Sequence, residues 1–259
     1  MAVNIQIPDL GDKYKDYRDE IPGDSYNWGP VINASQIASL TIHHSVTTQT
    51  AKNDGNWKAE CNKIANLHLA KGWGGVGYRF IVASDGTVAY VGDLSHGGSG
   101  VENQNNVTFS ICLVGDFTKE LPTAYQINST HKLCKFFLFD TPQYPNVNDW
   151  GDIKGHKEWK ATACPGTNWK VAGDNLYDRI KNDNWQGYPD PKPIVAPQPS
   201  PSLSPSPSMS ISPSISPSTS PSPSQAPDDP YVTLQKVEDI LFGVNGVQDK
   251  LDELRVLLP

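Results

Sequence analysis

Two residues late in this chain have side chains and a spacing that suit a metal ion. His156 and Cys164 are good zinc ligands, and a Pro-Gly pair closes the loop between them. A third ligand must come from elsewhere, and the best donor is the pair His43 and His44. Three protein ligands leave the fourth position of a tetrahedral zinc open for water, which is the pattern of a catalytic site. Taken alone, His156 and Cys164 would more often be ordinary loop and core residues than metal ligands.

The apolar run that ends in the two histidines predicts a strand. Alternation places Leu40, Ile42 and His44 on one face and Thr41 and His43 on the other. Because the aliphatic face should be buried, we expect His43 to point toward a groove. His44 is then expected to be a core residue or a support for the ligands.

Hydrophobic periodicity predicts the elements that must position these side chains. Helices are expected at 53–72, 122–139 and 169–180, and strands at 40–44, 77–83, 87–91, 107–115 and 153–155. The second and third strands are joined by Asp85-Gly86, which is a hairpin signal. Residues 1–30 read as an irregular arm with no assigned chemistry. This order of elements predicts an α/β fold with a mixed central β-sheet flanked by helices.

Composition divides the 259 residues into three parts. Residues 1–188 form the expected catalytic domain, and the Pro/Ser-rich stretch 189–227 is expected to be an extended linker. In residues 228–259, apolar side chains recur at helical spacing but form a seam too narrow for a core. That tail is expected to be helical and to form a homo-oligomer or bind the substrate surface. The formal net charge of −7 argues against a nucleic-acid enzyme.

The sequence shows neither a signal peptide nor a membrane span. No basic segment followed by an apolar one opens the chain, and no apolar run has membrane-spanning length. We therefore expect a chain made in the cytoplasm. With Cys164 assigned to the metal, Cys61, Cys112 and Cys134 are expected to be buried thiols, with one disulfide among them as the alternative.

Six motifs, in order, carry a family resemblance over roughly residues 38–182. They are Ile-His-His-Ser at 42–45, Gly-Trp at 72–73 with Val-Gly-Tyr-Arg-Phe at 76–80, Asp-Gly-Thr at 85–87, Leu-Val-Gly-Asp at 113–116, Gly-His at 155–156 and Ala-Cys-Pro-Gly at 163–166. Through these six motifs the chain resembles the zinc-dependent N-acetylmuramoyl-L-alanine amidases of the peptidoglycan recognition protein and phage lysozyme-amidase type.

The resemblance implies roles for individual residues. His43, His156 and Cys164 match the zinc ligands of that family, so the resemblance selects the same histidine that strand alternation selects. Tyr78 matches the catalytic tyrosine, and Thr162 matches a catalytic position that is lysine in some members and threonine in others. Both hydroxyls are expected to donate hydrogen bonds to the oxyanion that develops in the reaction.

Three further residues are candidates for substrate binding. His96 and Asn106 match loop positions that line the substrate groove in relatives, although His96 is equally well explained as a loop histidine. His68 ends the first predicted helix, where a structural role is the main expectation and a place in the groove is the alternative.

The resemblance implies hydrolysis of the amide bond between N-acetylmuramic acid and L-alanine in bacterial peptidoglycan. Catalytic domain, linker and small tail without a signal peptide look like a phage endolysin, which acts on the cell wall after the membrane has been opened. The main alternative is a module that recognises peptidoglycan without cutting it, but such members typically lose the cysteine ligand that Cys164 provides here. A zinc nuclease is disfavoured by the acidic charge and by the cysteine.

Overall fold

The computed structural model describes residues 2–47 and 57–187. The predicted linker and helical tail lie outside these residues, as do the predicted helix caps at positions 53 and 54.

A single mixed sheet organises the described residues. Its strands are β1 (Tyr14–Asp16), β2 (Ser39–His44), β3 (Phe80–Val82), β4 (Val88–Tyr90), β5 (Thr108–Leu113) and β6 (Ile153–Gly155). They lie in the order β1-β4-β3-β5-β2-β6. Only β3 and β4 pair antiparallel, as the hairpin signal predicts, and the other neighbours pair in parallel. The predicted mixed α/β fold is confirmed.

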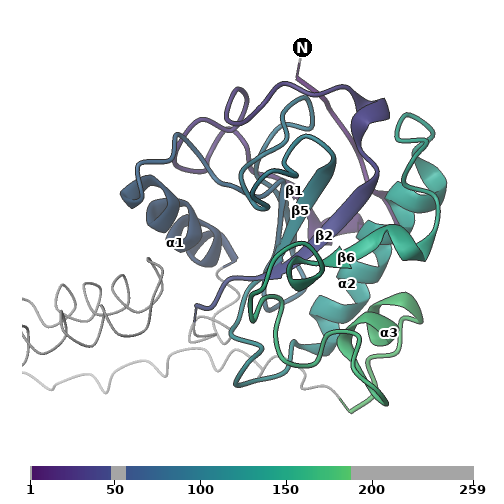
Figure 1. The fold of residues 1–259 in the computed structure, drawn as a ribbon. Coiled ribbons are helices and arrows are strands. Elements are labelled where there is room, and N and C mark those ends of the chain that lie inside the picture. Colours follow the sequence, from purple (N-terminus) through teal and green to yellow (C-terminus); the bar gives the residue numbers. More distant parts are fainter. Residues whose placement is uncertain (1, 48–56, 188–259) are drawn as a thin grey trace, which may run out of the picture. The chain divides into compact units, whose positions relative to one another are not determined.

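Helices cover both faces of this sheet (Figure 1). Helix α1 (Trp57–Ala70) lies on one side, and α2 (Ala124–Lys135) and α3 (Leu176–Lys181) lie on the other. The apolar side chains divide accordingly: Leu40 and Ile42 of β2 belong to the core under α2 and α3, whereas Ile81 and Cys112 belong to the core under α1. Strands β2 and β5 are buried on both faces, which is typical of parallel strands between two helical layers.

Helix α2 begins later than predicted, and its π-helical continuation ends close to the predicted end at residue 139. Thr123 is its cap, accepting a hydrogen bond from the backbone of Gln126, so Pro122 lies before the helix and not in its first turn. The chain then continues as one π-helical turn, Phe136–Asp140. The strands predicted at 77–83 and 87–91 are shorter than predicted, with three residues each.

The last helix is predicted wrongly over its first half. Residues 169–175 are not helical, and α3 begins only after Asn175, whose side chain accepts a hydrogen bond from the backbone of Asp178. Gly173 has a φ of +85°, a left-handed conformation that interrupts a helix. Trp169 lies outside the helix but is still buried, because its indole donates a hydrogen bond to Glu158 and its ring packs edge-on against Tyr177 of α3.

The N-terminal arm is more ordered than the irregular segment that its sequence suggests. A 3₁₀ segment, Pro8–Lys13, leads directly into β1, which pairs in parallel with β4 at the edge of the sheet. The arm therefore completes the sheet and does not simply cover it.

The thiols follow the prediction. Cys61, Cys112 and Cys134 are buried and free, so the alternative of one disulfide among them is wrong. No helix within residues 2–47 and 57–187 has the length and apolar character needed to cross a bilayer.

Candidate active site

Two parallel strands bring the histidines together. Strand β6 pairs with β2 in a register that sets Gly155 against Ile42. The next residue of each strand is therefore a histidine, His43 in β2 and His156 directly after β6. Carboxyl ends of parallel strands lie at one edge of a sheet, which is where α/β proteins place their ligand sites. The two imidazole rings lie 4.6 Å apart between centroids.

Cys164 completes a cluster of three metal-ligating side chains. The possible ligand atoms of His43, His156 and Cys164 all lie within 4.8 Å of one another. The Cys164 Sγ atom is 3.6 Å from Nδ1 of His43. Tetrahedral zinc, with bonds of about 2.0–2.1 Å to nitrogen and about 2.3 Å to sulfur, holds such atoms roughly 3.5–3.6 Å apart. The two-nitrogen, one-sulfur donor set and the distance between Cys164 and His43 therefore fit zinc.

The protonation of His43 also suits a metal ligand. Its other ring nitrogen, Nε2, lies 3.2 Å from the hydroxyl of Ser110 on β5. If Nε2–H donates to that hydroxyl, Nδ1 keeps its lone pair toward Cys164, which is the arrangement that metal-bound histidines generally show. Burial, and then the charge of His156, hold the pKa of His43 well below its ordinary value. Burial also lowers the pKa of His156. Both rings are therefore neutral at pH 7.

Ser110 is a site residue that sequence reasoning missed. Strand β5 alternates Thr108, Ser110 and Cys112 on one face, and its register sets Ser110 beside Thr41, two residues before His43. Polar residues at alternate positions of an otherwise apolar central strand are the signal that would have revealed it.

A tight loop fixes Cys164 beside β2. Its carbonyl accepts a hydrogen bond from the backbone N–H of Lys157, and its Sγ accepts one from the backbone N–H of His44. Burial raises the pKa of this thiol to about 12. A metal cation reverses that preference, because a coordinating thiol is deprotonated. The Cys164 side chain is therefore a neutral thiol without a cation and a thiolate when a cation is bound.

Glu158 holds the start of the same loop against the sheet. Its Oε1 accepts hydrogen bonds from the backbone of Gly155 (2.8 Å) and the indole of Trp169 (2.7 Å). A side chain at Gly155 would place its Cβ 2.5 Å from Nε1 of that indole. Gly155 is therefore required for the close approach that delivers His156.

His44 supports the cluster, as predicted, and is not part of it. Its Nδ1 accepts a hydrogen bond from the backbone of Phe117 at 3.1 Å. Burial lowers the pKa of His44 to about 4, although Asp116 acts in the opposite direction. The ring is neutral at pH 7, so its 3.9 Å approach to the Asp116 carboxylate is not a salt bridge.

Tyr78 lies next to the metal-ligating cluster, just before β3. Its ring centroid is 5.1 Å from that of His43 and 5.3 Å from that of His68. Burial raises the pKa of Tyr78, and the neighbouring thiols of Cys112 and Cys164 act in the same direction, so the hydroxyl keeps its proton. It therefore remains able to donate a hydrogen bond.

Thr162 is exposed, two residues before Cys164 in the loop. Its Oγ1 accepts a hydrogen bond from the backbone N–H of Cys164 at 3.3 Å, so its hydroxyl proton is not used in that contact. The structure thus brings Thr162 and Tyr78 to the loop and the strand that flank the cluster.

His68 is buried beneath Tyr78. Its Nδ1 accepts a hydrogen bond from the backbone of Gly77 at 3.1 Å, and its ring lies 4.6 Å from that of Trp73. Only 7% of the residue is exposed, and burial lowers its pKa to about 4. These contacts favour the structural role expected for His68. Its assignment to substrate binding stays a prediction.

Buried, neutral His68 is expected to make the domain less stable in acid. The unfolded chain binds a proton at His68 below about pH 6.5, whereas the folded chain does so only near pH 4. The contribution is therefore full above about pH 6.5 and is lost as the pH falls toward 4, by on the order of 3 kcal/mol. In His68→Gln, an amide oxygen can replace Nδ1 as acceptor without titrating. Urea unfolding of the metal-free proteins should show a smaller loss of stability in the variant between about pH 7 and about pH 4.5. Equal losses would contradict this role.

The two loop candidates lie in different places. Half-buried His96 follows β4, and its loop continues past the cluster, since a Cβ on Gly100 would lie 3.3 Å from Nε2 of His43. Asn106 is exposed in the turn before β5, at the opposite end of that strand from Cys112, which pairs with His43. The structure brings the His96 loop to the cluster and does not bring Asn106 there. Both assignments to substrate binding stay predictions.

Comparison with known proteins places this geometry in a family. The family model described as N-acetylmuramoyl-L-alanine amidase (Amidase_2) matches residues 33–167, just over half of the 259 residues. The chain belongs to this amidase family. The matched residues include the three members of the cluster and all the other site residues predicted above.

Relatives in this family include both recognition proteins and an amidase. Peptidoglycan-recognition protein SC2 of Drosophila simulans is 29% identical over 159 residues, which cover 59% of this chain and 78% of that protein. The N-acetylmuramoyl-L-alanine amidase of Sus scrofa is 30% identical over 138 residues, covering 50% of this chain and 22% of that protein.

Two solved structures are also similar to part of this chain. The N-acetylmuramoyl-L-alanine amidase LysC from Clostridium intestinale URNW is 26% identical, with a TM-score of 0.46, over 61% of this chain and 91% of LysC. Drosophila PGRP-LB is 20% identical, with a TM-score of 0.47, over 68% and 96% of the two chains. Because the curated relatives include both recognition proteins and an amidase, the choice between cleavage and recognition must come from the site itself.

Proposed function

We propose that this protein is a zinc-dependent hydrolase that cleaves the amide bond between N-acetylmuramic acid and L-alanine in bacterial peptidoglycan. The observation that carries the proposal is the convergence of His43, His156 and Cys164, whose possible ligand atoms lie within 4.8 Å of one another, in a chain of the amidase family. Three ligands leave one position for water or substrate, as in catalytic zinc sites.

The chain's own residues suit that chemistry. A zinc ion held by the three ligands would supply a Lewis acid that polarises the amide carbonyl and lowers the pKa of a water molecule. The Tyr78 hydroxyl keeps its proton, and the Tyr78 ring lies 5.1 Å from that of His43, which supports our proposal that this hydroxyl donates a hydrogen bond to the oxyanion. Thr162 has a free hydroxyl proton in the loop that bears Cys164 and can act as a second donor. Because threonine is uncharged, this donor is weaker than a lysine would be.

Recognition of peptidoglycan without cleavage is the second candidate, favoured by the similarity to peptidoglycan-recognition proteins. It requires no metal. A buried thiol whose pKa burial raises to about 12, with two neutral imidazoles beside it, is better explained as a metal site than as part of a binding surface.

A zinc assay combined with mass spectrometry of digested peptidoglycan tests the proposal. We expect about one zinc per chain and free L-alanine amino termini on the released peptides, with intact N-acetylmuramic acid on the glycan. Activity should disappear with a chelator and return with zinc. Binding of the wall without new amino termini would support the recognition function instead.

We further propose that the protein acts as a phage endolysin, made in the host cytoplasm and reaching the cell wall after the membrane is opened. The support is the sequence plan of a catalytic domain, a Pro/Ser linker and a short tail. Expression inside a bacterium should leave cells intact until the membrane is permeabilised, and early lysis would contradict this assignment.

The tail, residues 228–259, is proposed to join copies of the chain, which would increase avidity for a repetitive wall surface. We expect sedimentation to show an oligomer for the full chain and a monomer for a chain that ends near residue 190. Monomers in both cases would exclude self-association and leave binding to the wall as the role of the tail.

A further inference from the structure

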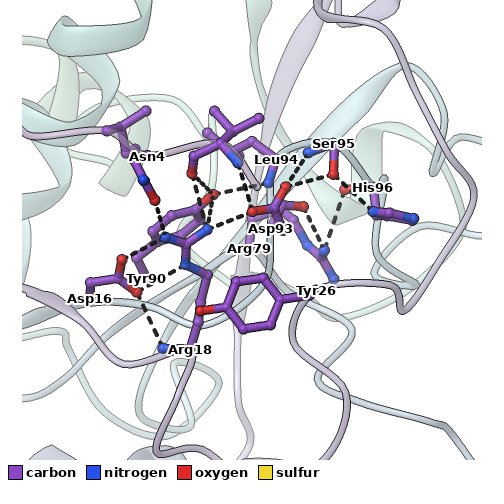
Figure 2. A network of polar contacts seen from close by, with 12 residues as sticks. Asn4, Asp16, Arg18, Tyr26, Arg79, Tyr90, Asp93, Leu94, Ser95 and His96 are labelled. Atoms are coloured by element: carbon purple, nitrogen blue, oxygen red, sulfur yellow. Dashed lines mark hydrogen bonds and ion pairs between the residues drawn. The ribbon is translucent and has the colours of Figure 1, made fainter. Parts of the chain in front are cut away.

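A buried ion pair that the proposed reaction does not use lies beside Ser95 and His96 (Figure 2). The guanidinium of Arg18, from the N-terminal arm, lies 2.5 Å from the carboxylate of Asp93, just after β4. Their side chains are 2% and 0% exposed. The same guanidinium bonds Asp16 and stacks over the ring of Tyr90 at 4.1 Å. The pair is therefore rigidly held and fixes the negative charge of Asp93 in place.

Both oxygens of Asp93 accept hydrogen bonds. Oδ2 accepts from Arg18 and from the backbone of Val3 at 2.9 Å. Oδ1 accepts from the backbone of Ser95 at 2.9 Å and from the Ser95 hydroxyl at 2.6 Å. The short hydroxyl contact to a carboxylate is charge-assisted, and a carboxylate can only accept. The single proton of the Ser95 hydroxyl is thus committed to Asp93.

The hydrogen bond from Ser95 to Asp93 determines which nitrogen of the neighbouring His96 ring carries a proton. The Ser95 oxygen lies 3.0 Å from Nδ1 of His96 and has no second proton to donate. Nδ1 must then carry the proton and donate it to Ser95. In a neutral imidazole the other nitrogen, Nε2, is left as an acceptor.

The backbone around His96 is fixed independently of the serine. The buried guanidinium of Arg79 donates to the carbonyl of Asp93 at 3.0 Å and to the carbonyl of His96 at 3.3 Å. Farther along the same loop, Ser99 donates its backbone N–H to Gly77, the residue before Tyr78. The ring of His96 therefore lies on a loop anchored to the segment that carries the proposed oxyanion donor.

We propose that Ser95 is a positioning residue that holds His96 as its Nδ1–H tautomer, so that Nε2 accepts a hydrogen bond from an N–H or O–H group of the muropeptide. This inference rests on the proposed function for the identity of the ligand. The specificity is for a donor, such as an acetamido N–H or a sugar hydroxyl, because the lone pair of Nε2 disfavours a carboxylate at this position.

Nitrogen-15 NMR of the imidazoles in the zinc-loaded full chain tests the tautomer directly. The six histidines can be labelled selectively, and the His96 signals assigned by their loss in His96→Gln. At a pH where His96 is neutral, we expect protonated Nδ1 and unprotonated Nε2. Ser95→Ala should shift the ring toward the Nε2–H form, and Ser95→Thr should restore the original pattern. Ser99→Ala, a matched serine whose hydroxyl has no partner among the described residues, should leave the His96 signals unchanged.

A second arm measures recognition with a soluble disaccharide-tetrapeptide muropeptide. Ser95→Ala should raise KM about tenfold, the loss of roughly one hydrogen bond, with kcat little changed. Ser95→Thr should restore KM. An Nε2–H ring in the unaltered protein, or an unaltered ring in Ser95→Ala, would overturn the tautomer assignment. A changed tautomer with an unchanged KM would overturn the substrate contact. If the protein binds the muropeptide without cleaving it, the Kd values of the variants are compared in place of KM. Failure of the proposed reaction can then be distinguished from failure of this inference.

Discussion

Replacing Cys164 by serine is expected to abolish peptidoglycan hydrolysis and to remove most of the bound zinc. A hydroxyl is a poor zinc ligand at neutral pH, whereas the thiolate is a strong one. Loss of a partner that only orients a ligand typically costs about 10–100-fold in metal affinity or activity, so loss of the ligand itself should cost more. Zinc content after gel filtration and release of L-alanine amino termini measure the two effects.

Two comparisons make the Cys164→Ser result specific. Circular dichroism should show a folded domain, because Cys164 lies in a loop and serine has a similar size. His44→Ala is the matched control beside the cluster. It leaves the backbone N–H that contacts Cys164 but removes the acceptor for Phe117, so it should lower stability and retain zinc. Full hydrolysis by Cys164→Ser would disprove the metal assignment.

Tyr78→Phe is expected to lower turnover by on the order of a hundredfold or more, the usual effect of losing one hydrogen-bond donor to an oxyanion. The change deletes a single hydroxyl, and the ring can keep its packing against His43 and His68. Zinc content should therefore be unchanged, and kcat should fall more than KM rises.

The contact between Tyr78 and Cys112 offers a control for this result. If the hydroxyl serves only to satisfy that thiol, Tyr78→Phe will change stability and leave turnover intact. Cys112→Ala removes the thiol but keeps the hydroxyl, so it should retain most of the turnover. Unchanged turnover in Tyr78→Phe would restrict Tyr78 to a packing role.

Much of the site was predictable because strand alternation and register are local rules. The alternation in β2 separates His43 from His44, and the structure places them accordingly, one toward Cys164 and the other toward Phe117. Alternation does not predict how deeply a side chain is buried. The prediction that His43 points toward a groove does not indicate its exposure, which is only 1%, because both faces of β2 are covered by other elements.

Features that depend on distant partners were not predictable. Trp169 has helical spacing to later apolar residues, but its indole bonds Glu158, so the tertiary contact overrides the periodicity. Arg18 appears in a polar, aromatic segment with no periodic pattern, and its role emerges only when Asp93 is brought beside it. Ser110 likewise becomes meaningful only through the register of β5 with β2.

The lengths of the outer strands bear on how this domain behaves at high concentration. The sheet ends in β1 on one side and β6 on the other, and each has only three residues, half the length of β2 and β5. Exposed strand edges act as templates for pairing with other chains, and short edge strands are one way in which proteins prevent it. The catalytic domain should therefore stay dispersed when many copies accumulate, because its sheet offers a neighbouring molecule almost no backbone on which to extend.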